Sequence, residues 1–214
     1  MTTRIIIARH GNTFTKDQTP TRVGCRTDLP LVENERGLNI GRYLKKYNLM
    51  PDVVFASPLQ RTMQTARLAL QAMDSSAPLY EDNTFKEIDY GPDENKTEDE
   101  VIARIGQDAI DNWNKKGIVP DGWIVDVPFI IQNWKAVADN AVKQFHDKTV
   151  LIVSSNGIIR FAPYLTGDFE AFSADHDIKV GTGCLCIFEK EDTDDHFKCV
   201  AWNVKPSHFL DECK

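Results

Sequence analysis

The sequence alternates between short apolar runs typical of β-strands and longer segments whose apolar residues recur at helical spacing. Such alternation is typical of βαβ units, in which consecutive strands lie parallel and helices cover the sheet. We therefore expect an α/β protein, a three-layer sandwich with a mainly parallel central sheet flanked by helices. The last two strands flank the acidic turn "KEDTDD" and are expected to pair as a hairpin. The expected strands are Arg4–Ala8, Val53–Ala56, Thr149–Ser154, Gly183–Glu189 and His196–Asn203.

Two of the expected helices have clear start signals. Ser57 is the expected N-cap of the helix after the second strand, with Pro58 at its first position. Thr97 and Glu100 match a capping box, in which each residue bonds the backbone of the other. Apolar residues at helical spacing follow the box as far as Ala109, and we expect them in one helix.

The length and composition indicate one globular domain. The chain has 214 residues, 42% hydrophobic and 27% charged, so we expect a single domain over residues 1–214. Residues 81–100 contain nine acids and two lysines, which is typical of a solvated segment rather than a core element. We expect residues of about 83–130 to form a small helical and acidic insertion over the functional site.

The charge and the ends of the sequence limit the expected partners. A formal net charge of −7 argues against nucleic acid or an anionic membrane as a partner. No apolar run approaches the roughly 20 residues that cross a bilayer. The N-terminal "MTTRIII" lacks the pattern of a secretory signal, so we expect a cytoplasmic protein.

The cysteines predict neither a disulfide framework nor a metal site. The chain has five cysteines, an odd number, and Cys184 and Cys186 are not spaced as in a CxxC site. In a strand their side chains point the same way, as expected of two small core residues. Reduced thiols in a cytoplasm fit this pattern.

Polar residues stand where three of the predicted strands end. Arg9, His10 and Gly11 follow the first strand, and Arg61 lies in "FASPLQRT" at the start of the helix after the second. The third strand ends in "VSSNGIIR", where another helix is expected to begin. Ligands of open α/β sheets bind at the carboxyl ends of the strands, so we expect these groups to lie together.

Two arginines and a histidine beside helix N-termini predict a phosphoryl site. Arginine forks match phosphate oxygens, and a helix N-terminus favours anions. A neutral imidazole nitrogen can attack phosphorus, and Gly11 lets the backbone approach closely. A lone Arg-His-Gly tripeptide also occurs by chance, and a single histidine is more often structural. It is Arg61, the second arginine, that favours the functional interpretation.

These motifs together resemble a known family. "ARHGNT", "TDLPLVENERG", "ASPLQRTMQTA" and "FKEIDYG" occur in the order and spacing of the histidine phosphatase superfamily, in its phosphoglycerate mutase-like branch. The resemblance covers most of the chain. It implies that His10 is a nucleophile that becomes phosphohistidine and that Arg9 and Arg61 bind the phosphoryl oxygens.

The resemblance also implies a role for Glu87 in "KEIDYG". This residue would donate a proton to the leaving group and later act as the base that activates water. Such a carboxyl group needs partial burial to raise its pKa. The sequence offers apolar neighbours for it in Phe85, Ile88 and Tyr90. The other interpretation is one more surface acid in an acidic stretch.

The chain departs from the family pattern at one turn. The family carries a second histidine in a turn of the form "VSHGGxIR", whereas here Ser155 stands at the histidine and Asn156 at the first glycine. Both can donate hydrogen bonds, but neither supplies charge, and one lost preorganised donor typically costs about 2.7–4 kcal/mol. Three outcomes stay open: neutral donors suffice, another group replaces the charge, or the pocket binds ligands without turnover. His176 is the best substitute by position, but its two flanking aspartates favour the interpretation as a solvated surface histidine.

Further candidates for substrate binding lie outside these core positions. Asn12 belongs to the first motif, and Lys16 lies where relatives often carry an asparagine that contacts substrate. Arg22 and Arg26 lie in the loop that runs beside the pocket mouth in this family. Each can meet a second anionic group or be a solvated charge. Arg160 is expected to form a structural ion pair behind the turn.

The leading interpretation is a phosphatase that hydrolyses a small phosphomonoester through phosphohistidine on His10, without a metal or other cofactor. The alternatives are a weakly active or inactive protein that binds a phosphorylated ligand or a partner, and a phosphomutase. A pure binding site needs neither a nucleophile nor a proton donor, so the presence of both His10 and Glu87 favours the enzyme. A mutase would need a lid that excludes water, and no segment of the sequence indicates one.

Overall fold

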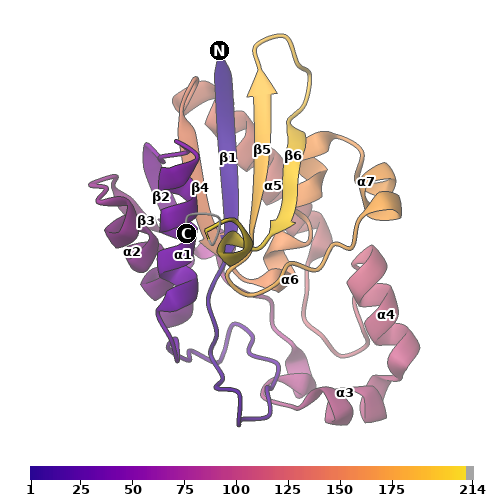
Figure 1. Ribbon diagram of the computed structural model, residues 1–214. Coiled ribbons are helices and arrows are strands. Elements are labelled where there is room, and N and C mark those ends of the chain that lie inside the picture. Colours follow the sequence, from indigo (N-terminus) through magenta and orange to yellow (C-terminus); the bar gives the residue numbers. More distant parts are fainter. Residues whose placement is uncertain (211–214) are drawn as a thin grey trace.

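A central sheet organises the computed structural model, which describes residues 1–210 (Figure 1). In this part of the chain the sheet has six strands in the order β3-β2-β4-β1-β5-β6. The five strands expected from the sequence are all present. The sixth, β3, was not expected, because it is only three residues long and its side chains are not fully buried. The strands are β1 (Thr2–Arg9), β2 (Val53–Ala56), β3 (Leu79–Glu81), β4 (Thr149–Ser154), β5 (Leu185–Glu191) and β6 (Lys198–Val204).

The sheet is parallel on one side of β1 and antiparallel on the other. The pairs β1–β4, β4–β2 and β2–β3 are parallel, whereas β5 pairs antiparallel with β1 and with β6. The expected α/β class and the terminal hairpin are thus confirmed. Because β1, β2 and β4 run in one direction, their carboxyl ends meet at the same edge of the sheet.

Helices cover both faces of the sheet, which explains the unbroken apolar run in β1. Ile6 and Ala8 pack in one buried cluster with helices α1 and α2, and Ile5 and Ile7 pack in a second cluster with Trp134 of α5. A strand buried on both faces needs no polar alternation. The helices are α1 (Glu35–Lys46), α2 (Gln60–Met73), α3 (Glu98–Ile105), α4 (Gln107–Lys116), α5 (Val127–Gln144), α6 (Asn156–Ile159) and α7 (Phe169–Asp175).

The helix start signals are confirmed in one case and wrong by a few residues in the other. Thr97 caps α3, and both bonds of its capping box with Glu100 are present. Helix α2, however, begins at Gln60 with Leu59 as its N-cap, so Ser57 is not the cap. The Ser57 hydroxyl instead lies 3.4 Å from the Leu59 nitrogen and 3.1 Å from the hydroxyl of Thr62, inside the turn that precedes the helix.

The single helix expected from Val101 to Ala109 is two helices. Gly106 separates α3 from α4 with a φ of +83°, a backbone conformation that favours glycine. Both helices lie beyond the carboxyl ends of the parallel strands, below the sheet in Figure 1. Asp93 ties this region together, because its buried carboxylate accepts from Arg104 at 2.6 Å and from the Trp123 indole at 2.7 Å.

Two expectations concern features outside the site. Within residues 1–210, no helix combines the length and the apolar character that a membrane span requires. Cys184 lies just before β5 and Cys186 lies within it, and both are buried, as expected of core residues. Cys25 and Cys199 are also free thiols, and Cys213 lies outside the described residues.

Candidate active site

The end of β1 is held on both sides by backbone hydrogen bonds. The Arg9 nitrogen donates to the Cys184 carbonyl at 2.9 Å, and the His10 nitrogen donates to the Ser154 carbonyl at 3.1 Å. The Gly11 nitrogen donates to the hydroxyl of Thr65 on α2 at 3.0 Å. The sheet and α2 therefore fix the backbone of Arg9, His10 and Gly11 where the strand ends.

The His10 imidazole is buried and neutral. Its Nδ1 lies 2.7 Å from the Gly11 carbonyl, which can only accept, so Nδ1 carries the proton and Nε2 keeps its lone pair. Burial lowers the pKa of His10 well below its usual value, and the positive charges of Arg61 and Arg9 lower it further. Position 10 thus presents an unprotonated nitrogen in a positive environment, which suits a nucleophile toward an electron-poor centre.

Arg61 lies fully buried in the first turn of α2. Its guanidinium donates to the carbonyls of Thr27 at 2.8 Å, Gly24 at 3.2 Å and Val23 at 3.3 Å. These bonds hold the loop that follows β1 against α2. Burial lowers the pKa of Arg61, although the Glu87 carboxylate offsets part of this effect. The interior therefore holds a cation without a direct carboxylate partner among the described residues.

Four buried polar atoms of predicted site residues have no hydrogen-bond partner within residues 1–210. They are Nε of Arg9, Arg22 and Arg61 and Oγ of Ser155. Arg9 also donates from Nη1 to the Val180 carbonyl at 2.5 Å. Unpaired buried donors are costly, so a bound water or ligand is the partner that such donors require.

Glu87 is a buried carboxyl group at the same edge. Its oxygens accept from the backbone nitrogens of Ile88 at 2.9 Å and Gly157 at 3.2 Å. Burial raises its pKa, and these two bonds and the arginines offset only part of the effect. The surroundings are apolar as the sequence predicts, since Phe85, Ile88 and Tyr90 are all buried. A carboxyl group of this kind can carry a proton and give it away.

The turn between β4 and α6 contains Ser155 and Asn156, at which the sequence is predicted to depart from the family pattern. Ser155 precedes α6 and is completely buried. The side-chain oxygen of Asn156 accepts from the Val180 nitrogen at 2.8 Å. That Ser155 occupies the place of the family's second histidine stays a prediction.

A cavity of about 620 Å³ opens at this edge of the sheet. Seven of the predicted site residues line it: Arg9, His10, Asn12, Lys16, Arg22, Glu87 and Asn156. Arg61 and Ser155 are buried behind its wall, with no exposed surface. No group of three or more His, Cys, Asp or Glu side chains within residues 1–210 is placed to hold a metal ion.

The outer candidates differ in their surroundings. Arg22 lines the cavity and pairs with Glu98 at 2.5 Å. Arg26 does not line the cavity, because its guanidinium bonds Asp89 and the Gly91 carbonyl instead. Thus only one of the two loop arginines faces the site.

The side chain of Asn12 is held by its neighbours rather than free in the cavity. The amide orientation that satisfies both neighbours has its nitrogen donating to the hydroxyl of Thr182 at 2.7 Å and its oxygen accepting from Arg36 Nε at 2.9 Å. Thr182 lines the same cavity, so this contact joins the loop after β1 to the segment before β5.

Two cavity residues were missed or misassigned by sequence reasoning. Arg160 does not form the expected ion pair: its Nη1 donates to the Trp113 carbonyl at 2.6 Å, and its guanidinium lies 3.8 Å from the centre of the Trp113 ring. Lys179 also lines the cavity, and no sequence motif marked it. Its place depends on how the segment before β5 lies across β1, which no local pattern shows.

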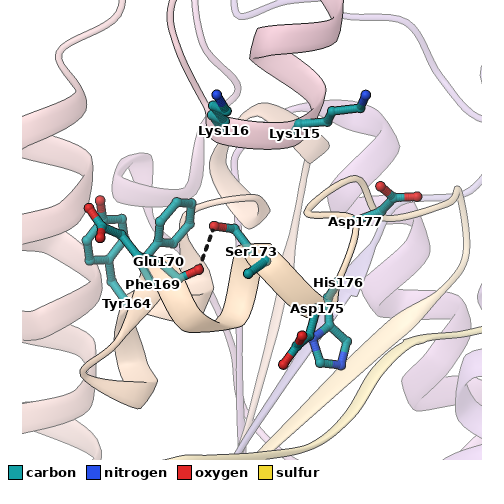
Figure 2. Close-up of a pocket in the computed structure, with 10 residues that line it drawn as sticks. Lys115, Lys116, Tyr164, Phe169, Glu170, Ser173, Asp175, His176 and Asp177 are labelled. Carbon is teal, nitrogen blue, oxygen red and sulfur yellow. Dashed lines mark hydrogen bonds between the residues drawn. The ribbon is translucent and has the colours of Figure 1, made fainter.

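His176 does not reach the site. It lines a separate cavity of about 860 Å³ between α4 and α7, shown in Figure 2 with Lys115 and Lys116 on the opposite wall. Its ring is exposed and stacks on Phe172 at 4.4 Å between centroids. His176 therefore does not replace the missing charge, and its interpretation as a solvated surface histidine is confirmed. None of the strand-end residues lines this second cavity.

Comparisons with known proteins show the family to which the chain belongs. Residues 5–205 match the family described as the histidine phosphatase superfamily (branch 1). The 2,3-bisphosphoglycerate-dependent phosphoglycerate mutase of Bifidobacterium longum (strain DJO10A) is 32% identical over 126 residues, covering 56% of this chain and 49% of that protein. The corresponding mutase of Cutibacterium acnes is 27% identical over 186 residues, covering 80% and 68%. The chain spans about half the length of the first of these relatives.

Solved structures of low sequence identity share the fold. A mycobacterial glucosyl-3-phosphoglycerate phosphatase superposes with a TM-score of 0.74 at 18% identity, covering 95% of this chain and 100% of that one. The alpha-ribazole phosphatase of Shigella flexneri has a TM-score of 0.69 at 21% identity, with 94% and 96% covered. With the match over nearly the whole sequence, these likenesses lead to one conclusion: the chain belongs to the histidine phosphatase superfamily, branch 1.

Proposed function

We propose that this protein is a phosphoric monoester hydrolase that works through a phosphohistidine on His10. The observation that carries the proposal is the state of His10. Its Nδ1 proton is bonded to the Gly11 carbonyl, and its unprotonated Nε2 lies in a pocket made positive by Arg9 and Arg61. An uncharged imidazole beside two cations suits attack on a phosphoryl group, whose oxygens the cations would bind.

In the first step, Nε2 of His10 bonds to phosphorus while the bond from phosphorus to the ester oxygen breaks. Glu87 gives its proton to the departing oxygen, so an alcohol leaves. The raised pKa of Glu87 supports this role, because the carboxyl group then holds a proton closer to neutral pH. Arg9, which lines the cavity, binds the phosphoryl oxygens, and the positive charge of the buried Arg61 helps to stabilise the charge that develops on them.

In the second step, water replaces the imidazole at phosphorus. Glu87, now a carboxylate, takes a proton from the attacking water as the new bond to phosphorus forms. The bond from phosphorus to nitrogen breaks, and neutral His10 and inorganic phosphate result. Glu87 donates a proton in the first step and accepts a proton in the second, so one carboxyl group serves both steps.

The Ser155 hydroxyl takes part as a neutral donor in this scheme. It is buried and unpaired among the described residues, so no protein group uses its proton, and it reaches a phosphoryl oxygen when the cavity wall beside Asn156 adjusts to the ligand. A neutral donor stabilises the developing charge less than an imidazolium does. We therefore expect turnover that is slower than in a site with two histidines, with the same covalent intermediate.

The substrate that the cavity suits is a small phosphorylated molecule. A volume of about 620 Å³ is within the range of sites for small ligands. The solved structures of the same fold include two named as phosphatases, and the sequence relatives are named as mutases. Hydrolysis is favoured over mutase chemistry here because no motif in the sequence indicates a lid that would exclude water from the cavity.

The test is a rapid-quench experiment with an activated aryl phosphate labelled with ³²P, in buffer that contains a chelator. We expect acid-labile, base-stable label on the wild-type protein and release of phosphate. The His10→Ala variant should show neither, whereas His176→Ala, which removes a histidine outside the site, should match the wild type. A wild-type protein without label or turnover under conditions where Ser155→His is active would refute the hydrolase. Full activity in His10→Ala would refute the mechanism.

A further inference from the structure

The segment before β5 is tied to the site through the peptide groups of one residue. The carbonyl of Val180 accepts from Nη1 of Arg9 at 2.5 Å, and the nitrogen of Val180 donates to the side-chain oxygen of Asn156 at 2.8 Å. Two residues from different strand ends thus hold Val180 between them. The main chain at this point cannot shift without breaking a bond to a site residue.

This attachment determines where the neighbouring Lys179 lies. Burial alternates along the segment: Ile178 and Val180 are fully buried, whereas Lys179 is exposed and lines the cavity. The buried pair anchors the segment in the core, and the lysine side chain is left on the side of the ligand. No ion pair or hydrogen bond of its ammonium group to another residue in the range 1–210 is present.

The charges around Lys179 are mostly of its own sign. Arg9, Arg160 and Arg22 line the same cavity and their charges disfavour its own, whereas the charge of Glu98 favours it. Partial burial and then the charge of Arg9 lower the pKa of Lys179. Glu98 does not neutralise this group, because Arg22 holds its carboxylate at 2.5 Å. Basic side chains outnumber the acidic ones that line this cavity, and such an excess of positive charge is stabilised by a bound anion or by water.

Other cations of the cavity are already engaged with protein groups. The Arg160 guanidinium bonds and stacks on Trp113, and Arg22 bonds Glu98. Lys16 lies on the loop after β1, with no tie to the strand-end residues comparable to that of Lys179. Val180, the residue after Lys179, accepts a hydrogen bond from Arg9 through its carbonyl. Lys179 is therefore the cation best placed to act together with Arg9.

We propose that Lys179 binds the anionic ligand of this cavity directly and that Asn156 positions it through the peptide groups of Val180. The inference rests on the proposed function, since the ligand is the phosphoryl group or an anionic group attached to it. The proposal also gives a reason for the predicted departure from the family pattern at Ser155 and Asn156. Ser155 supplies no charge, and the next residue, Asn156, holds a lysine over the same cavity.

The direct role is tested by the affinity of the full chain for inorganic phosphate, measured by titration calorimetry. We expect Lys179→Met to bind phosphate about tenfold more weakly, the size of one charge-assisted hydrogen bond. Lys179→Arg, which keeps the charge, should retain most of the affinity. Lys115→Met is the matched control, because Lys115 is an exposed lysine that lines the other cavity. Equal affinity in Lys179→Met and the wild type would overturn the proposal.

The positioning role is tested by a double-mutant cycle with Asn156→Ala. We expect Asn156→Ala to weaken phosphate binding in the wild type and to have little further effect in Lys179→Met. An equal loss in both backgrounds would show that Asn156 acts without Lys179 and would overturn the positioning role. A merely structural effect would lower the melting temperature in both backgrounds without this coupling.

The two proposals fail in different ways. A protein that binds phosphate through Lys179 but never forms phosphohistidine would refute the hydrolase and support the ligand role of Lys179. A protein that forms phosphohistidine while Lys179→Met binds phosphate as tightly as the wild type would refute the role of Lys179 alone. Absence of phosphate binding to the wild type would overturn the role of Lys179, whereas the hydrolase stands or falls with the rapid-quench experiment.

Discussion

Gly157 lies directly against the carboxyl group of Glu87. Its backbone nitrogen donates to Oε2 at 3.2 Å, and a Cβ atom on residue 157 would lie 2.2 Å from Oε1. The hydrogen bond and the absence of a side chain at Gly157 together allow the Glu87 carboxyl group to contact the backbone of the turn between β4 and α6.

The first prediction follows from this contact. Gly157→Ala forces the Glu87 carboxyl group to move, and a displacement of this order in a catalytic group costs about 10²-fold in kcat. The measurement is steady-state hydrolysis of an activated aryl phosphate. In a Glu87→Gln background the same change should cost little more, since the acid is already absent. A large further loss there would show that Gly157 acts on another group.

The raised pKa of Glu87 makes stability depend on pH. Its folded pKa lies above the unfolded value of 4.5, so between these values the folded state binds more protons and its stability falls as pH rises. We expect Glu87→Gln, which cannot titrate, to gain stability relative to the wild type as pH rises from about 4.5 toward neutrality. Urea unfolding of both proteins over this range measures the difference. A constant difference would mean that Glu87 is not protonated above its ordinary pKa.

Arg61 is predicted to stabilise the fold as well as the ligand. Two separate nitrogens of the Arg61 guanidinium reach these carbonyls, and the single compact ammonium of lysine does not match that fork, so we expect Arg61→Lys to cost about 2–4 kcal/mol of unfolding free energy. Phosphate affinity should fall as well. Arg67→Lys is the control, because Arg67 lies on the same helix and is exposed. Chemical denaturation of both variants gives the comparison, and equal stability would contradict the role of the three bonds.

The Ser155 hydroxyl is predicted to matter although it has no partner among residues 1–210. Ser155→Ala removes only this oxygen, and we expect a decrease of about 10-fold in kcat/KM for an aryl phosphate. Ser155→Thr, which keeps a hydroxyl, should be less affected, and Ser155→His should increase the rate of phosphorylation by adding charge. An unchanged rate in Ser155→Ala would exclude the hydroxyl as a donor.

Asp93 is predicted to stabilise the packing of α3 against the segment that contains Trp123. Asp93→Asn removes the charge from its bonds with Arg104 and gives the Trp123 indole a poorer acceptor. We expect a loss of about 2–3 kcal/mol in unfolding free energy. Asp99→Asn, an exposed acid on α3, is the control. Thermal or urea unfolding with equal midpoints in the two variants would contradict this prediction.

The sequence predicts the strands that carry the site because each is a continuous apolar run followed at once by polar residues. It does not predict β3, which is a short exposed edge strand, and it does not show that Gly106 divides a helix. Both features depend on a few residues whose local pattern is weak. Burial on both faces, by contrast, leaves a strong signal in β1.

Within the site, the sequence identifies residues that belong to motifs and misses those placed by distant contacts. Arg160 was located correctly but its partner was not, because Trp113 is 47 positions away in the chain. Lys179 was missed because its position follows from a bond between Arg9 and Val180, 171 residues apart. For His176 the flanking aspartates pointed correctly to a solvated surface residue, although its nearness in sequence to β5 left a place in the cavity open as the alternative.

One feature of the mouth of the cavity bears on how the protein can be redesigned. Thr21 pairs with Thr97 in an isolated antiparallel bridge, and the Arg22 backbone bonds the carbonyl of Lys96 at 2.9 Å and the nitrogen of Asn95 at 2.8 Å. These bonds join main-chain atoms only, so they are independent of the side chains that the two segments carry. The backbone of residues 21–22 and 95–97 is therefore held in place at the mouth of the cavity. Side chains of these residues that face the ligand can be varied in mutant libraries to alter substrate preference while the catalytic centre keeps its geometry.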